Sequence, residues 1–189
     1  MDGAPLPDLI PAWDADGLLK PMDKLEVHRR GLRHKAISVF VMDGTRVLLQ
    51  KRAAGKYHTP GLWTNTCCTH PHWDEDDLAC AYRRLREEMG IDRLLLVPLV
   101  DLEYRADVGG GLTEHEMVRL FLARARPDLT VDPDPAEVEA VRWVDLYDLA
   151  ADVRRHPGAY TPWLRIYLDR HLETLAGPAR LSLSGATLR

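Results

Sequence analysis

The sequence predicts a single domain of the mixed α/β (α+β) class, in which β-sheets are flanked by helices. The chain has 189 residues, of which 46% are hydrophobic and 29% are charged, a balance typical of a folded domain rather than a disordered or fibrous chain. β-branched apolar runs, which predict strands, are interspersed along the chain with segments whose apolar residues recur at helical spacing. This order of elements indicates the class. The formal net charge of -4 offers no basic field for nucleic acid or an anionic membrane, so any anionic ligand must be held locally.

The composition also bears on the cellular compartment. No apolar run reaches the ~18 residues of a membrane span, and the first residues lack the basic and apolar regions of a secretory signal. The three cysteines, Cys67, Cys68 and Cys80, are an odd number, which does not fit a disulfide framework. We therefore expect a cytoplasmic protein with free thiols.

We expect an N-terminal arm over residues 1–23, one domain over residues 24–176 and a flexible tail over residues 177–189. The start of the arm is too rich in proline for a helix, so we expect it to lie on the surface. The tail mixes glycine, serine and small residues, a composition typical of a mobile end.

The domain should begin with a β-hairpin and a long loop. The apolar runs 36–42 and 47–51 flank Asp43-Gly44, a strong hairpin signal. Residues 53–73 are rich in glycine and proline and contain one short extended piece, residues 62–70. Loops of this length are often functional.

The clearest helix is predicted near residues 75–90. Its apolar positions recur at spacings of three and four, and Gly90 is a plausible C-terminal stop. The remaining runs predict strands at residues 94–100, 102–104, 116–124 and 141–144. Helices are predicted at residues 146–153 and 162–175, the second forming a C-terminal helical extension.

The segment Glu114-His115-Glu116 suggests a metal site. On a strand its two glutamates would point the same way, and that face continues as Val118, Leu120 and Leu122. An unpaired charge there would cost several kcal/mol, so a cation is expected to meet the carboxylates. Three imidazoles would complete a site for Mn²⁺, Zn²⁺ or Fe²⁺, and the candidates are His28, His34 and His70. The alternative is a solvated loop, because residues 109–111 are all glycine.

The cysteines are expected to differ in role. If residues 66–70 are extended, Cys68 and His70 share one face while Cys67 faces the other way. A thiol beside a metal-bound imidazole could be a ligand or an acid/base group, whereas Cys67 and Cys80 fit buried, inert cysteines better.

The predicted helix carries a longer pattern. Arg83 with Glu87 and Arg84 with Glu88 could be ordinary surface pairs, but they fall within a frame that resembles the Nudix box, G-x5-E-x7-R-E-U-x-E-E-x-G-U. The members of the frame are Thr69, Glu75, Arg83, Arg84, Leu85, Glu87, Glu88, Gly90 and Ile91. Thr69 stands where the first glycine belongs, and Arg84 replaces a glutamate. In Nudix hydrolases these glutamates hold Mg²⁺ against a diphosphate, so a cation at this position points away from pyrophosphate cleavage.

Four further segments resemble the type I isopentenyl-diphosphate Δ-isomerases, a branch of the Nudix superfamily. They are residues 61–71 (GLWTNTCCTHP), 104–106 (YRA), 114–116 (EHE) and 160–163 (YTPW), and the likeness covers about residues 24–168. The resemblance implies the Nudix fold.

The resemblance also implies a set of site residues. Metal ligands would be His28, His34, His70, Glu114 and Glu116, with a second ion, Mg²⁺, bridging the diphosphate to Glu88. The catalytic residues would be Cys68, Glu116, Tyr104, which orients Glu116, and Trp163, which covers the reacting carbons. The diphosphate would be gripped by Lys24, Arg52, Lys56 and Arg84.

The implied reaction is the isomerisation of isopentenyl diphosphate to dimethylallyl diphosphate in isoprenoid biosynthesis. Protonating an alkene makes a carbocation, which requires an acid, a base, a dry site and an aromatic wall. The expected partners are this small-molecule substrate and neither nucleic acid nor membrane, in a monomer or weak homodimer. The alternatives are a Nudix pyrophosphohydrolase acting on a nucleoside diphosphate derivative, and a structural Zn²⁺ site in a binding domain.

Overall fold

The computed structural model describes residues 8–184, with side chains described up to residue 177. Within that range nine strands join one sheet: β1 (Leu9–Trp13), β2 (Leu19–Asp23), β3 (His34–Asp43), β4 (Arg46–Arg52), β5 (Trp63–Thr64), β6 (Cys67–Thr69), β7 (Val97–Gly109), β8 (Leu112–Arg124) and β9 (Val138–Asp145). The helices are α1 (Lys24–Arg30), α2 (Asp77–Met89), α3 (Leu146–Arg155), the short η1 (Pro157–Ala159) and α4 (Pro162–Ser184). The predicted α+β class is confirmed.

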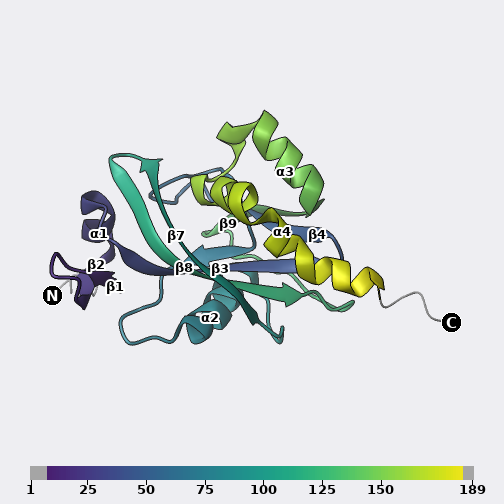
Figure 1. Cartoon of the computed structure of the whole chain (residues 1–189), viewed down its shortest axis with the longest axis horizontal. Coiled ribbons are helices and arrows are strands. Elements are labelled where there is room, and N and C mark those ends of the chain that lie inside the picture. Colours follow the sequence, from purple (N-terminus) through teal and green to yellow (C-terminus); the bar gives the residue numbers. More distant parts are fainter. Residues whose placement is uncertain (1–7, 185–189) are drawn as a thin grey trace.

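β3 is the central strand of the sheet. It pairs antiparallel with β1, β4 and β6 and parallel with β8, which in turn pairs antiparallel with β7. Figure 1 shows α2 on one side of the sheet and α3 with α4 on the other. Successive residues of β3 point into different cores: Phe40 packs on the side of α3 and α4, whereas Val39 and Val41 pack with α2. The two cores hold the sheet between two helical layers.

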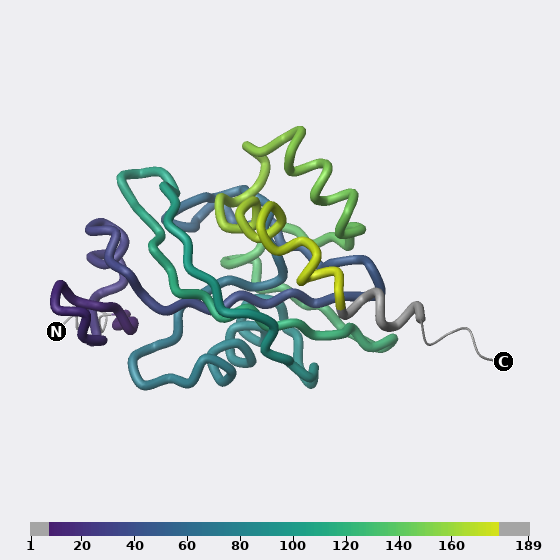
Figure 2. Tube along the Cα trace, in the orientation of Figure 1, coloured from purple at the N-terminus to yellow at the C-terminus, as the bar shows by residue number. Residues whose placement is uncertain are grey.

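The N-terminal segment differs from the predicted surface arm. β1 and β2 pair as an antiparallel hairpin, and Ala12 pairs with His34 at the start of β3. Ile10 and Ala12 are fully buried against Val27 of α1, so the segment is integral to the fold. Strands tolerate proline where its missing N–H is not needed, so the prolines do not prevent strand pairing here. Figure 2 places this hairpin and α1 at one end of the molecule, far from α3.

The hairpin formed by β7 and β8 replaces several shorter predicted strands. Glu114 and Glu116 both lie within β8 and are buried, so the solvated-loop alternative is wrong. In the sheet register, Tyr104 of β7 stands opposite Glu116, and His34 of β3 pairs with Glu116 on the other side. Strand pairing therefore brings residues from three distant parts of the chain to one place.

The C-terminal helix is longer than predicted. α4 continues to Ser184, with a kink at His171, where the backbone is non-helical (φ -130°, ψ 16°). The expected tail from residue 177 is thus partly helical, and residues 185–189 lie outside the described residues. None of the helices in the described range combines the length and apolarity needed to cross a bilayer.

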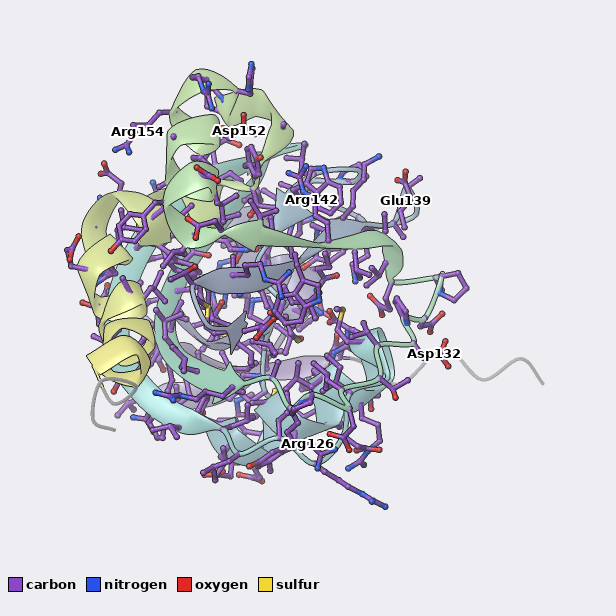
Figure 3. The ribbon with its side chains drawn as sticks, turned by 90° about the vertical axis from the view of Figure 1, so that its right-hand side faces the viewer. Arg126, Asp132, Glu139, Arg142, Asp152 and Arg154 are labelled. Carbon is purple, nitrogen blue, oxygen red and sulfur yellow. The ribbon has the colours of Figure 1, made fainter. Side chains whose placement is uncertain are left out.

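A chain of polar contacts fixes the segment that leads into α4. Arg142 Nη2 donates to the Tyr160 hydroxyl at 2.9 Å, and that hydroxyl donates to Asp152 of α3 at 2.5 Å. Figure 3 shows Arg142 on the sheet and Asp152 on the helix above it. The Thr161 amide donates to the Trp63 carbonyl at 3.0 Å, which joins the start of α4 to β5. These contacts determine where Trp163 enters the core.

Gly90 ends α2 in a conformation that only glycine adopts without strain, so it gives a stability prediction. Its φ is 63°, and an added Cβ would lie 2.4 Å from the Asp132 carbonyl oxygen. We expect Gly90→Ala to lower the free energy of unfolding by about 3–4 kcal/mol, measured by urea titration. Gly110 is the matched control, because its φ is 64° but nothing lies within 4 Å of an added Cβ. The free energy of unfolding of Gly110→Ala should fall by only about 1–2 kcal/mol. Equal losses of stability in the two alanine variants would contradict the proposed clash at Gly90.

Candidate active site

Three histidines and a glutamate from four segments converge where the parallel strands β3 and β8 begin. His28 comes from α1, His34 begins β3, His70 follows β6 and Glu114 lies on β8. One ligand atom from each lies within 4.8 Å of all the others. The Nε2 atoms of His28, His34 and His70 lie 3.3, 3.4 and 3.7 Å from Oε2 of Glu114, and all four side chains are buried. The cluster has the composition of a metal centre.

The ring orientations in this cluster fit a metal ion. His28 Nδ1 lies 2.5 Å from the Lys24 carbonyl oxygen, and His34 Nδ1 lies 2.7 Å from the Leu32 carbonyl oxygen. A carbonyl only accepts, so each ring carries its proton on Nδ1 and presents a lone pair on Nε2. Among the described residues, these two Nε2 atoms and Oε2 of Glu114 are buried without a hydrogen-bond partner. Imidazole nitrogens with a carboxylate oxygen suit a divalent transition ion such as Mn²⁺ or Zn²⁺.

The two neighbouring carboxyl groups differ in proton affinity. Burial, reinforced by the charge of Glu114, raises the pKa of Glu116 to about 8. Burial opposes ionisation of Glu114 as well, but contacts with the histidines outweigh it and hold the pKa of Glu114 well below its usual value. Glu116 Oε2 accepts the Tyr104 hydroxyl at 2.7 Å, and its Oε1 lies 3.0 Å from His70 Nε2. Glu116 is therefore suited to exchanging a proton near neutral pH.

A small cavity beside the cluster brings together the predicted proton-transfer residues. Its lining consists of Arg52, His58, Cys68, Thr69, His70, Tyr104, Glu114, Glu116 and Trp163. Cys68 and Glu116 thus face one cavity, whereas Cys67 is buried in the core beneath α2. This division follows from the alternation of side chains along β6. Burial raises the pKa of Cys68 to about 12, so its side chain is a neutral thiol at neutral pH.

Trp163 and Arg52 form another part of the wall. Trp163 Nε1 donates to Thr64 Oγ1 at 2.7 Å, which fixes the indole plane. The Arg52 guanidinium lies 5.4 Å from the indole centroid and donates to the His58 carbonyl oxygen at 3.1 Å. The guanidinium over the indole is a cation–π contact, the kind of interaction by which an indole face stabilises positive charge.

His58 is a site residue that the sequence reading missed. It is buried, and its Nε2 lies 3.2 Å from Glu114 Oε1. Burial lowers the pKa of His58 to about 3, so the ring is neutral. The residue sits in an irregular loop, where no periodic pattern indicates the direction of a side chain. The only available signal was its presence in a glycine- and proline-rich loop of functional length.

The predicted diphosphate-binding cations do not form one group. Lys56 forms an ion pair with Glu137, and Arg84 Nη2 lies 3.3 Å from the other oxygen of that carboxylate. Arg84 also contacts Glu88 at 2.5 Å, and Glu88 accepts from Gln50 Nε2 at 3.0 Å. Glu88 is therefore buried in an ion pair, outside the histidine cluster. No local pattern in the sequence indicates that Glu137 lies between Lys56 and Arg84.

Lys24 lies farther out. Its Nζ pairs with Asp8 at 3.2 Å and lies 5.7 Å from the centroid of the Tyr57 ring. The Lys24 side chain approaches the site through Tyr57, whose ring lies 4.3 Å from that of His58, while the Lys24 carbonyl oxygen contacts His28 Nδ1. Arg52 is the only one of the four predicted cations that lines the cavity within the described residues.

Comparisons with known proteins place the chain in a family. Residues 32–164 match the NUDIX domain. An isopentenyl-diphosphate Delta-isomerase of Cereibacter sphaeroides is 62% identical over 176 residues, 93% of this chain and 99% of the relative. One of Dinoroseobacter shibae is 61% identical over 175 residues, again 93% of this chain and 99% of the relative. The chain belongs to the isopentenyl-diphosphate Delta-isomerase family.

Solved structures support the Nudix fold of this isomerase family member. A protein of Deinococcus radiodurans has a TM-score of 0.69 at 12% identity, and covers 86% of this chain and 98% of its own. A MutT NUDIX hydrolase of Burkholderia pseudomallei has a TM-score of 0.54 at 26% identity and covers 74% of this chain and 98% of its own. The predicted Nudix fold is confirmed.

One Nudix-box residue has a structural role in this isomerase family member. The two Glu75 oxygens accept from Nε and Nη2 of Arg83, each at 2.7 Å, and one also accepts from the His72 amide. The Arg83 contact lowers the pKa of Glu75 from 4.5 to about 2. The pKa of Glu75 is lower in the folded state than in the unfolded state. The pair therefore stabilises the fold above pH 4.5, and that stability is lost as the pH falls toward 2.

We therefore expect Glu75→Gln to lower the free energy of unfolding by about 1 kcal/mol at neutral pH. The difference from wild type should shrink as the pH falls to about 3, because the wild-type carboxylate is then losing its advantage. Urea unfolding at several pH values measures this. Glu26→Gln is the control, since the side chain of Glu26 is paired, among the described residues, only with Arg30, in an exposed contact of 3.7 Å. A constant wild-type-to-variant gap across the pH range would rule out the assigned contribution of Glu75.

Proposed function

We propose that this protein converts isopentenyl diphosphate into dimethylallyl diphosphate through a tertiary carbocation, as a step of isoprenoid biosynthesis. The observation that carries the proposal is that the Cys68 thiol and the Glu116 carboxyl line one cavity with the Trp163 indole. Relatives more than half identical in sequence bear the name isopentenyl-diphosphate Delta-isomerase, which supports the same reaction. Such a reaction requires only proton transfers, and these two groups are the candidates for them.

Cys68 and Glu116 would exchange protons with different carbons of the substrate. One group gives a proton to the alkene, and the other removes a proton from the adjacent carbon to form the new double bond. Tyr104 donates to Glu116 Oε2 at 2.7 Å, and this contact would hold the carboxyl in a fixed direction.

Trp163 would stabilise the carbocation, and the cations would hold the diphosphate. An indole face attracts positive charge but does not capture it, which a carboxylate could do. Arg52 lines the cavity and is the nearest candidate for a phosphate oxygen. Lys56 and Arg84 share Glu137, so we infer that a diphosphate would compete with that carboxylate for both cations. Lys24 would join them at the rim of the site.

Two metal ions belong to this proposal. His28, His34, His70, Glu114 and Glu116 would hold Mn²⁺ or Zn²⁺, and Glu88 would hold Mg²⁺ together with the diphosphate. A divalent ion at the histidine cluster supplies charge that fixes Glu116 and increases its acidity. The buried Nε2 atoms without partners support the first site. For the second site, Glu88 would have to change its present pairing with Arg84.

The direct test is to incubate the protein with Mg²⁺, Mn²⁺ and isopentenyl diphosphate in deuterated water. The allylic isomer should form and should carry deuterium, as read by mass spectrometry and NMR. A parallel sample with a nucleoside diphosphate derivative in place of isopentenyl diphosphate tests the pyrophosphohydrolase alternative, which predicts release of phosphate from that derivative. Phosphate release without allylic product would overturn the proposal. The ion pair between Arg84 and Glu88 favours the isomerase, because it places a cation in the hydrolytic glutamate frame.

Removal of the metal distinguishes a catalytic centre from a structural zinc site. We expect dialysis against a chelator to abolish isomerisation while circular dichroism retains most of its native signal, because two hydrophobic cores hold the fold. Adding Mn²⁺ should restore turnover. Global unfolding on chelation would instead support a structural role for the cluster.

A further inference from the structure

Two buried polar side chains enclose Cys68 and have no role in the chemistry described so far. Ser38 lies on β3 directly opposite Cys68 in the register of β3 and β6, and Asn65 lies between β5 and β6. Both are fully buried. Three contacts close a ring: Asn65 Nδ2 to Ser38 Oγ at 2.9 Å, Ser38 Oγ to Cys68 Sγ at 2.8 Å, and Cys68 Sγ to Asn65 Oδ1 at 3.0 Å.

The backbone determines which way the Asn65 amide points. Its Nδ2 lies 2.9 Å from the Val39 carbonyl oxygen and 3.1 Å from the Cys67 carbonyl oxygen. Carbonyl oxygens only accept hydrogen bonds, so the amide nitrogen must occupy this side. Oδ1 consequently faces Cys68. A flipped amide would set an oxygen against two carbonyl oxygens inside a buried site, which is costly.

The orientation of the Asn65 amide determines which atom donates in each of the three hydrogen bonds. Asn65 Oδ1 can only accept, so the Cys68 sulfhydryl is the donor to it. A thiol has one hydrogen, and with that hydrogen committed the sulfur faces Ser38 as an acceptor. The Ser38 hydroxyl, which already accepts from Asn65 Nδ2, is therefore the donor to the sulfur. Every polar atom in the ring has its partner.

We propose that Ser38 is a positioning residue for Cys68, whose hydroxyl hydrogen bond stabilises the thiolate that forms during proton transfer; this rests on the proposed function. When the thiol gives up its proton, the S–H bond breaks, its electron pair stays on sulfur, and the alkene π pair forms the new C–H bond. In the opposite direction, a sulfur lone pair takes the proton and the C–H pair becomes the new π bond. In both cases the Ser38 donor remains aimed at the charged sulfur. Hydrogen bonds to a charged form favour that form.

The scaffold allows this role to be separated from a structural one. Asn65 bonds two backbone carbonyls, so its loss would disturb the fold around the site. Within residues 8–184, by contrast, the Ser38 hydroxyl bonds side chains rather than backbone. The Tyr167 phenol also lies near the Ser38 hydroxyl and could accept its hydrogen in place of the sulfur, so its loss is tested separately.

The test uses the full-length protein with the variants Ser38→Ala, Ser38→Thr, Tyr167→Phe and Thr66→Val. Thr66 is the matched control, because its buried hydroxyl lies in the same segment but bonds the Leu48 carbonyl and the Val41 amide. The first measurement is the rate of Cys68 alkylation by iodoacetamide at one fixed pH without substrate, followed by peptide mass spectrometry. The second is kcat and KM for isopentenyl diphosphate, after circular dichroism has verified the fold.

We expect Ser38→Ala to slow alkylation about tenfold, because the charge that forms on the sulfur then lacks the hydrogen bond from the Ser38 hydroxyl. The kcat value should fall about 10- to 100-fold while KM changes little. Ser38→Thr should recover most of both rates, and Thr66→Val and Tyr167→Phe should stay near wild type.

Unchanged alkylation and kcat in a folded Ser38→Ala protein would overturn the inference. So would an equal loss in Thr66→Val or Tyr167→Phe, or a folded Ser38→Thr protein as slow as the alanine variant. If the wild-type protein made no dimethylallyl diphosphate, the proposed function would fail, yet the alkylation rates would still decide whether Ser38 acts on the sulfur.

Discussion

Cys68→Ala is expected to reduce kcat for isopentenyl diphosphate isomerisation by about 10³-fold or more while the protein remains folded. Removing the sulfur deletes one of the two proton-transfer groups, and positioned acid–base groups contribute rate factors of about 10²–10⁴. KM should change much less, because the proposed mechanism gives the thiol a role at the reacting carbons and none in holding the diphosphate. Steady-state kinetics with the allylic product quantified by mass spectrometry measures the effect.

Cys67→Ala is the matched control for that experiment. Cys67 precedes Cys68 on β6 but is buried in the core beneath α2, away from the cavity. Losing its sulfur should cost about 1–2 kcal/mol of stability through a small void and leave kcat within a few-fold of wild type. If instead the two alanine variants lost activity to the same extent, the assignment of Cys68 to the reaction would be wrong.

Glu116→Gln should be the second most damaging change, with kcat lowered about 10²–10⁴-fold. The amide cannot exchange a proton as the carboxyl does, and it is a poorer ligand for the ion proposed at the histidine cluster. We therefore also expect a lower content of bound Mn²⁺ or Zn²⁺, measured by elemental analysis after dialysis. The amide is nearly isosteric, so the hydrogen bond from Tyr104 has an oxygen to accept it.

Glu103→Gln controls for the loss of a carboxylate on the same hairpin. Glu103 lies on β7, is exposed, and pairs with Arg33 at 3.1 Å and His115 at 3.0 Å. Its replacement should change stability by no more than about 0.5 kcal/mol and leave turnover intact. Normal turnover and metal content in Glu116→Gln would refute the role given to that carboxyl.

Patterns that repeat over a few residues were readable from the sequence. The spacing of apolar residues predicted the helix α2, and the Nudix-box frame placed Arg84 and Glu88 on that helix. Period-two alternation placed Cys68 and Cys67 on opposite faces, as the structure shows. It also placed Glu114 on the same face as Val118, which holds because the register of β8 is fixed by a buried face. The site residues themselves were predicted from the family resemblance.

Features that depend on contacts distant in sequence were not readable. α1 is seven residues long, capped by Asp23 and ended by Gly31, and too short for a periodic signal. The N-terminal hairpin is held by burial of Ile10 against α1, which its prolines conceal. His58 reaches Glu114 from an irregular loop.

The sequence by itself determined which face of each strand the candidate site residues share, because backbone geometry sets that period locally. Only the tertiary structure decided that β3, β6 and β8 lie side by side, and hence that Ser38 meets the Cys68 sulfur while His34 and Tyr104 flank Glu116. The physical reason is that strand neighbours are selected by burial of whole faces and by loop closure, energies summed over the entire domain that no short segment records.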